Sequence, residues 1–100
     1  MNNITSLEAE LGSRVASKKS NGKTITLDLI GEGKLRIDGT TTPISVRQDE
    51  TPSDATVTIT ADDFKALMDG TKKPEGLLLT GKAKMAGNPL AVMKLRDILA

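Results

Sequence analysis

The sequence contains no cysteine, no histidine and a single aromatic residue, Phe64. Without cysteine the chain can form no disulfide and no thiolate metal site, and without histidine it lacks the commonest general base and metal ligand. One aromatic ring gives no stacking surface for nucleic acid bases. These absences remove the side chains on which most catalytic sites depend. We therefore expect no cofactor, no metal site and none of the familiar catalytic constellations.

The chain also has no long apolar run and little net charge. No stretch approaches the roughly 20 apolar residues that span a bilayer, and the start, residues 1–4, lacks the basic and apolar regions of a signal peptide. The formal net charge is +1, whereas recognition of duplex nucleic acid usually needs a strongly basic surface. We expect a soluble, unexported protein that binds no nucleic acid and folds as a single domain over residues 1–100.

The charged residues are unevenly distributed along the chain. Residues 49–63 carry acidic side chains and no basic one. Charges of this kind most often form a solvated surface, and a basic patch that contacts an anionic membrane is the alternative interpretation for the last third of the chain. Its basic residues are Lys72, Lys73, Lys82, Lys84, Lys94 and Arg96.

The first half of the chain predicts a helix followed by three strands. Apolar residues at helical spacing predict a helix over about residues 6–17, and residues 5–8 have the form of a capping box. From Lys23 onward apolar and polar residues alternate, which is typical of half-buried strands. Turns at residues 31–33 and at Gly39 divide this region into an antiparallel meander. Its inward residues are Ile25, Leu27, Leu29, Leu35, Ile37, Ile44 and Val46.

The second half predicts a crossover and a fourth strand. The polar stretch 48–54 is long enough to cross the sheet instead of forming a tight hairpin. A strand follows at residues 55–60, and a short helix then runs to Gly70, which supplies its stop. Pro74 is placed to start one more helical turn.

A fifth strand and a last helix complete the predicted order. The strand is expected over residues 77–85, where apolar residues alternate with Lys82 and Lys84 and give it a basic outer face. Asn88 is a good N-cap and Pro89 suits the first helical position, so residues 89–100 are expected to be helical.

This last helix is apolar on nearly all sides. Ala91, Val92, Leu95, Ile98 and Leu99 form one broad face, whereas Leu90 and Met93 lie elsewhere on the helix. Such a helix must be covered on more than one side. Other helices, a second subunit and a bound apolar ligand are the candidates for this cover.

The predicted order of elements resembles the sterol carrier protein type 2 family, and the second half of the sequence resembles it more specifically. The similarity begins at residues 54–60 and continues through Asp63 and Phe64. It is densest at residues 79–88, Leu-Thr-Gly-Lys-Ala-Lys-Met-Ala-Gly-Asn, and closes at residues 93–95. Family members carry a similar run, an apolar pair followed by Gly-Lys-x-Lys-x-x-Gly-Asn, before a terminal amphipathic helix.

The resemblance implies an α+β fold, with a five-stranded mixed sheet, helices packed on one face and an apolar tunnel between them. Such a tunnel takes fatty acids, fatty acyl thioesters or sterols. Lys82 and Lys84 are candidates for contact with a lipid head group or an anionic membrane, although solubilising side chains on a strand are the simpler interpretation of both. Core packing is likewise an alternative for each residue that we expect to line the tunnel. These are Phe64, Leu67, Met68, Leu78, Leu79, Met85, Leu90, Met93 and Ile98.

Two functional hypotheses follow. In the first, the protein is a non-catalytic carrier of long-chain lipids; the chain ends without a Ser-Lys-Leu type peroxisomal address, which favours the cytoplasm. In the second, it is an adaptor that docks on a lipid-handling enzyme. An enzyme has little support, because the carboxylate pair Asp62 and Asp63 is explained by helix capping and the helix dipole.

Overall fold

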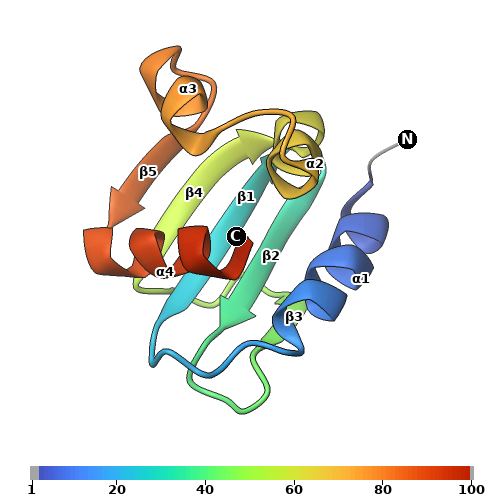
Figure 1. The fold of residues 1–100 in the computed structure, drawn as a ribbon, viewed down its shortest axis with the longest axis vertical. Coiled ribbons are helices and arrows are strands. Elements are labelled where there is room, and N and C mark those ends of the chain that lie inside the picture. The colour runs from blue at the N-terminus through green and yellow to red at the C-terminus, as the bar shows by residue number, and fades with distance from the viewer. Residues whose placement is uncertain (1–2, 100) are drawn as a thin grey trace.

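The computed structural model describes residues 3–99 and contains four helices and five strands in that range (Figure 1). The elements follow the chain in the order helix, three strands, strand, two helices, strand, helix. Their bounds are α1 Ile4–Val15, β1 Thr24–Ile30, β2 Gly33–Asp38, β3 Ser45–Gln48, β4 Ala55–Thr60, α2 Ala61–Asp69, α3 Pro74–Leu79, β5 Lys84–Gly87 and α4 Pro89–Leu99.

The strands form one mixed sheet in the order β3-β2-β1-β4-β5. Strands β1, β2 and β3 pair antiparallel, as the meander predicted. The chain then crosses to β4, which pairs parallel with β1 and places Leu27 beside Val57. Strand β5 adds antiparallel to β4. The crossover at residues 48–54, expected from its length and polarity, is confirmed.

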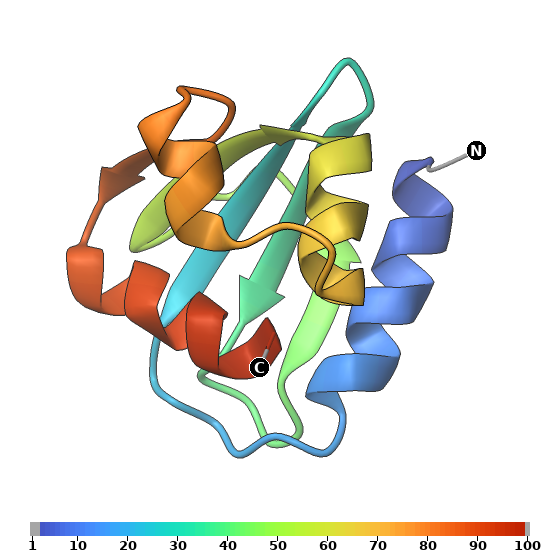
Figure 2. The ribbon, with the colours of Figure 1, turned by 45° about the horizontal axis from the view of Figure 1, so that its top comes forward.

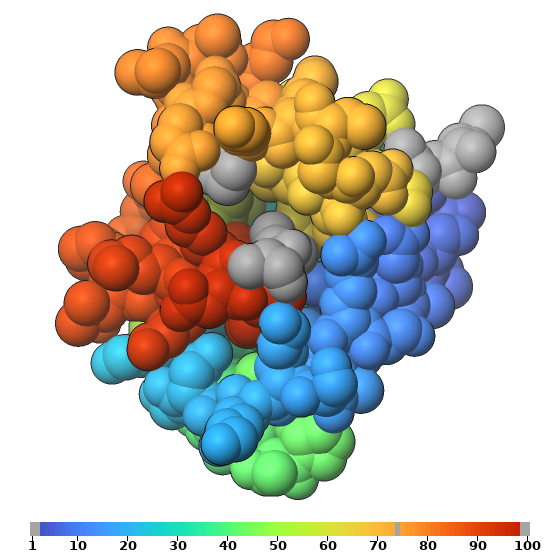
Figure 3. All heavy atoms as spheres, viewed as in Figure 1, coloured from blue at the N-terminus to red at the C-terminus, as the bar shows by residue number. Residues whose placement is uncertain are grey.

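The helices cover one face of this sheet (Figures 1 and 2). Helix α1 lies over β2 and β3, and α4 lies over β1 and β4. The space-filling view shows this face with α1 at one side and α4 at the other (Figure 3). Alternate strand residues such as Ile25, Leu27 and Leu29 point to the helices and are buried in one hydrophobic core. The α+β class with a five-stranded mixed sheet is therefore confirmed.

The side of the sheet away from the helices is polar, and the crossover is fastened to it by hydrogen bonds. Asp54 accepts hydrogen bonds at Oδ2 from the backbone N–H of Thr24 at 2.9 Å and from its hydroxyl at 3.2 Å. The hydroxyls of Thr26 and Ser53 lie 2.8 Å apart. These contacts hold the end of the crossover against β1, so β4 enters the sheet in a fixed register.

Helix α1 begins earlier than the sequence pattern predicted. Its N-cap is Asn3, whose side-chain Oδ1 accepts a hydrogen bond from the backbone N–H of Ser6 at 2.8 Å. The predicted capping box at residues 5–8 is therefore wrong. Asparagine caps as well as serine or threonine do, and a start at Ile4 adds one more apolar residue to the face that covers the sheet.

The fifth strand is shorter than predicted, because Leu77, Leu78 and Leu79 belong to helix α3. After this helix the chain turns sharply at Gly81, whose φ is +74°. The backbone N–H groups of Lys82 and Ala83 both donate to the carbonyl of Leu77. The strand starts only at Lys84, so the expectation that Lys82 and Lys84 project from one strand face is wrong.

Strand β5 ends at a glycine that the packing requires. Gly87 has a φ of +97°, and a Cβ there would lie 2.5 Å from the carbonyl oxygen of Asp54. Helix α4 follows at once, and the side chain of Asn88 accepts a hydrogen bond from the N–H of Leu90 at 2.9 Å. The predicted start of the last helix is confirmed. The side chain of Leu99 and all of Ala100 lie outside the described residues.

Candidate functional site

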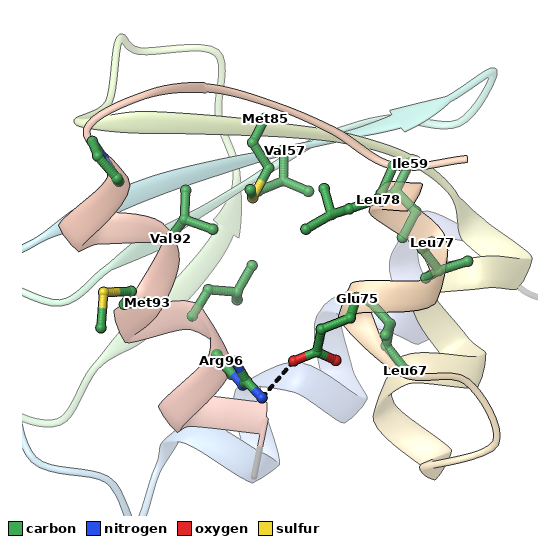
Figure 4. A pocket seen from close by; sticks show the side chains of 13 residues that line it. Val57, Ile59, Leu67, Glu75, Leu77, Leu78, Met85, Val92, Met93 and Arg96 are labelled. Atoms are coloured by element: carbon green, nitrogen blue, oxygen red, sulfur yellow. Dashed lines mark ion pairs between the residues drawn. The ribbon is translucent and has the colours of Figure 1, made fainter. Parts of the chain in front are cut away.

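A cavity of 280 Å³ lies between the sheet and the helices α3 and α4 (Figure 4). Val57 and Ile59 of β4 form its floor together with Met85 of β5, which pairs with Val57 across the strands. The helices supply the remaining walls. The full lining is Val57, Ile59, Leu67, Glu75, Leu77, Leu78, Ala83, Met85, Pro89, Val92, Met93, Leu95 and Arg96.

The cavity exists because α3 stands away from the sheet. Leu77 is buried and anchors this short helix, whereas Leu78 is only partly covered and Leu79 is 89% exposed. Ala83, which follows the helix, is buried but small, so it leaves part of the space below α3 unfilled. Native cores normally fill such space at high density. An apolar space of this size, left open in a small domain, is typical of a ligand pocket.

Helix α4 forms the opposite wall and has an uncovered side. Ala91, Leu95 and Ile98 are buried against the sheet, whereas Leu90 and Met93 are 57% and 61% exposed. The helix is apolar on nearly all sides, as predicted, but no described residue covers this second side fully. Met93 also lines the cavity, so part of that side faces the open space (Figure 4).

The charged groups of the lining form an ion pair between its two helical walls. Nη2 of Arg96 on α4 lies 2.5 Å from Oε1 of Glu75 on α3 (Figure 4). The side chains remain 66% and 50% exposed. Because both are accessible to water, the pair stabilises the fold only weakly. Its position matters more, since it joins the two helices between which the cavity lies.

A second ion pair holds the segment that leads into α3. Nζ of Lys72 donates to Oδ1 of Asp63 over 2.7 Å. Asp63 is buried, and its backbone N–H donates to Oγ1 of Thr60, the N-cap of α2. The hydrogen bond from Lys72 lowers the pKa of the Asp63 carboxyl below its usual value, and a hydrogen bond between the side chains of Asp63 and Thr60 adds to this effect. The carboxyl thereby ties the loop after α2 to the start of the same helix.

The structure brings four of the predicted lining residues together at the cavity: Leu67, Leu78, Met85 and Met93. Three others, Phe64, Met68 and Ile98, are buried in the core and do not line it. The remaining two, Leu79 and Leu90, are exposed side chains outside the lining. Contact of any of these nine residues with a lipid stays a prediction.

Sequence reasoning missed several lining residues and the ion pair. Four apolar lining residues show the same sequence pattern as core residues, so periodicity alone does not distinguish the cavity lining from the core. These are Val57, Ile59, Val92 and Leu95. Glu75 and Arg96 stand far apart in sequence, and no pattern predicts that α3 approaches α4.

The basic residues of the last third do not form a single cluster around the cavity. Lys84 pairs with Thr58 and therefore shares the polar side of the sheet, away from the helices. Lys82 is exposed in the turn before β5. On α4, Lys94 instead lines a separate shallow pocket of 210 Å³ beside Lys18 and Lys19. Of the predicted basic patch, Arg96 alone reaches the cavity.

The described residues offer no ready metal centre and no membrane-spanning helix. Between residues 3 and 99, no three acidic side chains lie close enough together to hold a metal ion. None of the helices in this range is both long and apolar enough to cross a bilayer.

Solved structures with the same architecture include sterol carrier proteins. The chain superimposes on the sterol carrier protein domain 2 of Helicoverpa armigera with a TM-score of 0.80, at 20% identity over 96% of this chain and 84% of that one. For palmitated SCP2L2 from Aedes aegypti the TM-score is 0.77, at 18% identity over 97% and 94%. The UbiJ-SCP2 ubiquinone synthesis protein gives 0.73, at 17% identity over 95% and 90%. At these identities the likeness concerns the fold.

The sequence itself identifies the family. Residues 2–100 match the SCP-2 sterol transfer family model. Because this match covers nearly the whole sequence, the chain belongs to that family. No curated protein matches the sequence.

The same fold also occurs as part of a larger enzyme. The sec-alkyl sulfatase PisA1 contains a region similar to 96% of this chain, with a TM-score of 0.77 at 13% identity, but that region is only 16% of the sulfatase. Domains with this fold therefore exist both as small proteins and within enzymes.

Proposed function

We propose that this chain binds one long-chain lipid in the cavity between β4, β5, α3 and α4 and carries it without chemical change. The cavity itself supports this proposal most directly, because its walls are apolar apart from one ion pair. Membership of the SCP-2 sterol transfer family agrees with it.

The energy of binding comes from burial of the lipid chain. Each buried methylene contributes about 0.8 kcal/mol, so a sixteen-carbon chain offers roughly 12 kcal/mol before the costs of association and ordering. Those costs leave an affinity in the micromolar range or tighter. Because apolar contact has little directional preference, fatty acids, fatty acyl thioesters and sterol-like molecules all remain in the proposed ligand class.

The small size of the cavity favours a slender extended chain over a bulky rigid ring system. Its 280 Å³ lies just below the range of typical ligand pockets, about 300–1,000 Å³. Two methionines, Met85 and Met93, lie in its wall, and their unbranched side chains adjust easily to a ligand. The palmitated relative from Aedes aegypti supports a fatty acid as the first ligand to test.

The edge around β5 is the proposed surface for delivery to an anionic membrane. The end of α3, strand β5 and the start of α4 follow one another along this side of the molecule (Figure 1). It exposes the apolar side chains of Leu79 and Leu90 together with Lys82 and Lys84. Exposed apolar groups beside cations suit a surface of anionic lipid.

An adaptor that docks on a lipid-handling enzyme is the second candidate. Leu79 and Leu90 favour it as well, because exposed apolar side chains also mark protein interfaces. The sulfatase, whose chain contains this fold as one part, shows that such a domain can be covalently joined to an enzyme.

Titration with a fluorescent fatty acid tests the carrier function. We expect saturable binding of one molecule per chain at micromolar concentration, reversed by competition with palmitate. Native mass spectrometry of protein purified from its own host should show the same stoichiometry and identify the cargo. A folded protein that gives no saturable fluorescence signal would rule out the carrier function and favour the adaptor. For an adaptor, we expect a molecular mass in solution that rises with protein concentration.

A further inference from the structure

We propose that Arg96 is the receptor for the lipid head group and that it selects anionic lipids by exchanging the carboxylate of Glu75 for that of the ligand. This inference rests on the proposed function and names the ligand class more narrowly. Of the described residues that line the cavity, Glu75 and Arg96 are the ones with charged side chains. A head group in the cavity therefore meets this pair.

The position of Arg96 on its helix brings the guanidinium to the cavity. Val92 precedes it by one helical turn and also lines the cavity, so the two side chains share one stripe of α4. Figure 4 shows both side chains on this wall, with Arg96 extended toward Glu75 across the space between the helices. A ligand whose chain lies along Val92 and Met85 would carry its head group to the guanidinium.

The exchange conserves the chemistry of the pair. Guanidinium presents five N–H donors in a planar fork that matches a carboxylate or a phosphate. Arg96 can therefore release one carboxylate and bind another with little net loss. Glu75 is half-exposed, so its freed carboxylate returns to water without a burial cost. An alcohol head group carries no charge and is a poor replacement for Glu75.

The exchange also removes the ion pair that ties α3 to α4. Among the described side chains of this helix, Leu77 is the buried one, and Glu75 makes the ion pair to α4. When the ligand replaces Glu75, this ion pair between the two helices is lost while Leu77 still holds α3 to the core. The ligand that fits Arg96 is thus the one that opens the space between the helices.

Three amphiphiles with the same chain and different head groups test this selection. Laurate, dodecyl phosphate and dodecanol should be compared by displacement of a fluorescent fatty acid, with the two anions below their critical micelle concentrations and dodecanol below its solubility limit. Wild type should bind the two anions about tenfold more tightly than dodecanol. Arg96→Gln should bind all three alike. The control Arg47→Gln removes an arginine of similar exposure, paired with Asp49 on β3's side of the sheet, and should behave as wild type.

Removal of the competing carboxylate gives a prediction of opposite sign. Glu75→Gln should strengthen laurate binding several-fold and leave dodecanol unchanged, because the ligand no longer displaces an ion pair. Melting temperatures should show that the variants are folded. Tighter binding of laurate than of dodecyl phosphate would assign the site to fatty acids, and the reverse order would assign it to phosphorylated lipids.

The failure of this inference differs from failure of the carrier function. If Arg96→Gln keeps the wild-type preference for anions, or if wild type binds the three amphiphiles equally, Arg96 is not the head-group receptor, yet the protein still carries lipid. If wild type binds none of them, the proposed function itself is wrong.

Discussion

Lys72 and Asp63 lie nine residues apart, and the 2.7 Å hydrogen bond between them closes the loop that connects α2 to α3. The contact lowers the pKa of Asp63 in the folded chain, chiefly through the hydrogen bond from Lys72. A carboxyl whose pKa is lower in the folded than in the unfolded chain stabilises the fold above its unfolded pKa, about 3.9. This contribution disappears as the pH falls through the folded pKa.

Asp63→Asn should therefore lower the free energy of unfolding by about 1 kcal/mol at pH 7, because Lys72 loses a charged partner. The difference from wild type should shrink below about pH 4 and vanish once Asp63 is protonated. Urea unfolding between pH 2 and 8 measures both effects. A difference that stays constant across this range would show that the carboxylate charge is not what stabilises the loop.

A control substitution separates this effect from general charge removal. Glu32→Gln, in the exposed turn between β1 and β2, should change the free energy of unfolding by less than about 0.5 kcal/mol. The stability of both variants should still fall at acidic pH, because three other carboxyls also have a lowered pKa. Hydrogen bonds from threonines lower the pKa of Asp38, Asp49 and Asp54.

Met93 and Leu95 both line the cavity but differ in burial, with 61% and 6% of each residue exposed. Met93→Glu should weaken fatty acid binding at least tenfold with little loss of stability, because its carboxylate can stay hydrated at the edge of the cavity. Leu95→Glu places a charge in the core and should cost several kcal/mol. Thermal melts and lipid titrations check the pair. Equal loss of stability in both variants would assign Met93 to the core and remove it from the site.

Two buried alanines offer a matched test of whether the cavity is open. Ala83 borders the cavity, whereas Ala91 is fully buried and does not. Ala83→Leu should fill vacant space, so stability should change little while lipid binding falls. Ala91→Leu should overpack the core and lower the free energy of unfolding by about 1–3 kcal/mol. Normal lipid affinity in a folded Ala83→Leu variant would place the ligand elsewhere.

Lys82 and Lys84 lie near the β5 edge from which we expect delivery. Transfer of a fluorescent lipid should be faster to anionic than to neutral vesicles, and the preference should shrink as salt rises, because the Debye length is about 10 Å at 0.1 M. The double variant Lys82→Glu/Lys84→Glu should lose this preference. The variant Lys19→Glu/Lys34→Glu makes the same change in net charge away from β5 and should keep it. Equal transfer by wild type and the first variant at low salt would mean that these lysines only solubilise the protein.

The backbone at the end of β5 gives a fifth prediction. Gly87→Ala should destabilise the protein by a few kcal/mol, since its φ is positive and its Cβ would collide with the carbonyl of Asp54. Gly12→Ala serves as the control. Its Cβ would meet nothing within 4 Å, and its place inside α1 predicts a gain of about 0.5–1 kcal/mol. Chemical denaturation of the two variants measures both changes in the free energy of unfolding, the loss in Gly87→Ala and the gain in Gly12→Ala.

The sequence predicted the sheet well because its signals there are local. The alternation of apolar and polar residues around Leu27 and Val57 is typical of half-buried strands. The polar stretch between β3 and β4 is too long for a hairpin. The error at Leu77–Leu79 has a different cause. Three consecutive leucines carry no period, so Pro74 and the tight turn at Gly81 decided the structure in favour of a helix.

The candidate site was less predictable than the fold, because it depends on how one element stands relative to another. Phe64 and Leu67 lie on the same short helix and carry the same apolar signal, yet Phe64 points into the core and Leu67 into the cavity. The contact between Glu75 and Arg96 depends on the separation of α3 from α4. That separation is a tertiary property with no counterpart in sequence spacing.

All thirteen lining residues lie between Val57 and Arg96, and none of the described residues of α1 or the meander β1–β3 lines the cavity. Ligand binding should therefore slow amide hydrogen exchange in α3, β5 and α4 and leave exchange in β1 and β2 almost unchanged. A pocket confined to one continuous stretch of chain can also change shape by substitution without disturbing the register of the central strands. The range of cargo and the stability of the sheet can then diverge independently among related sequences.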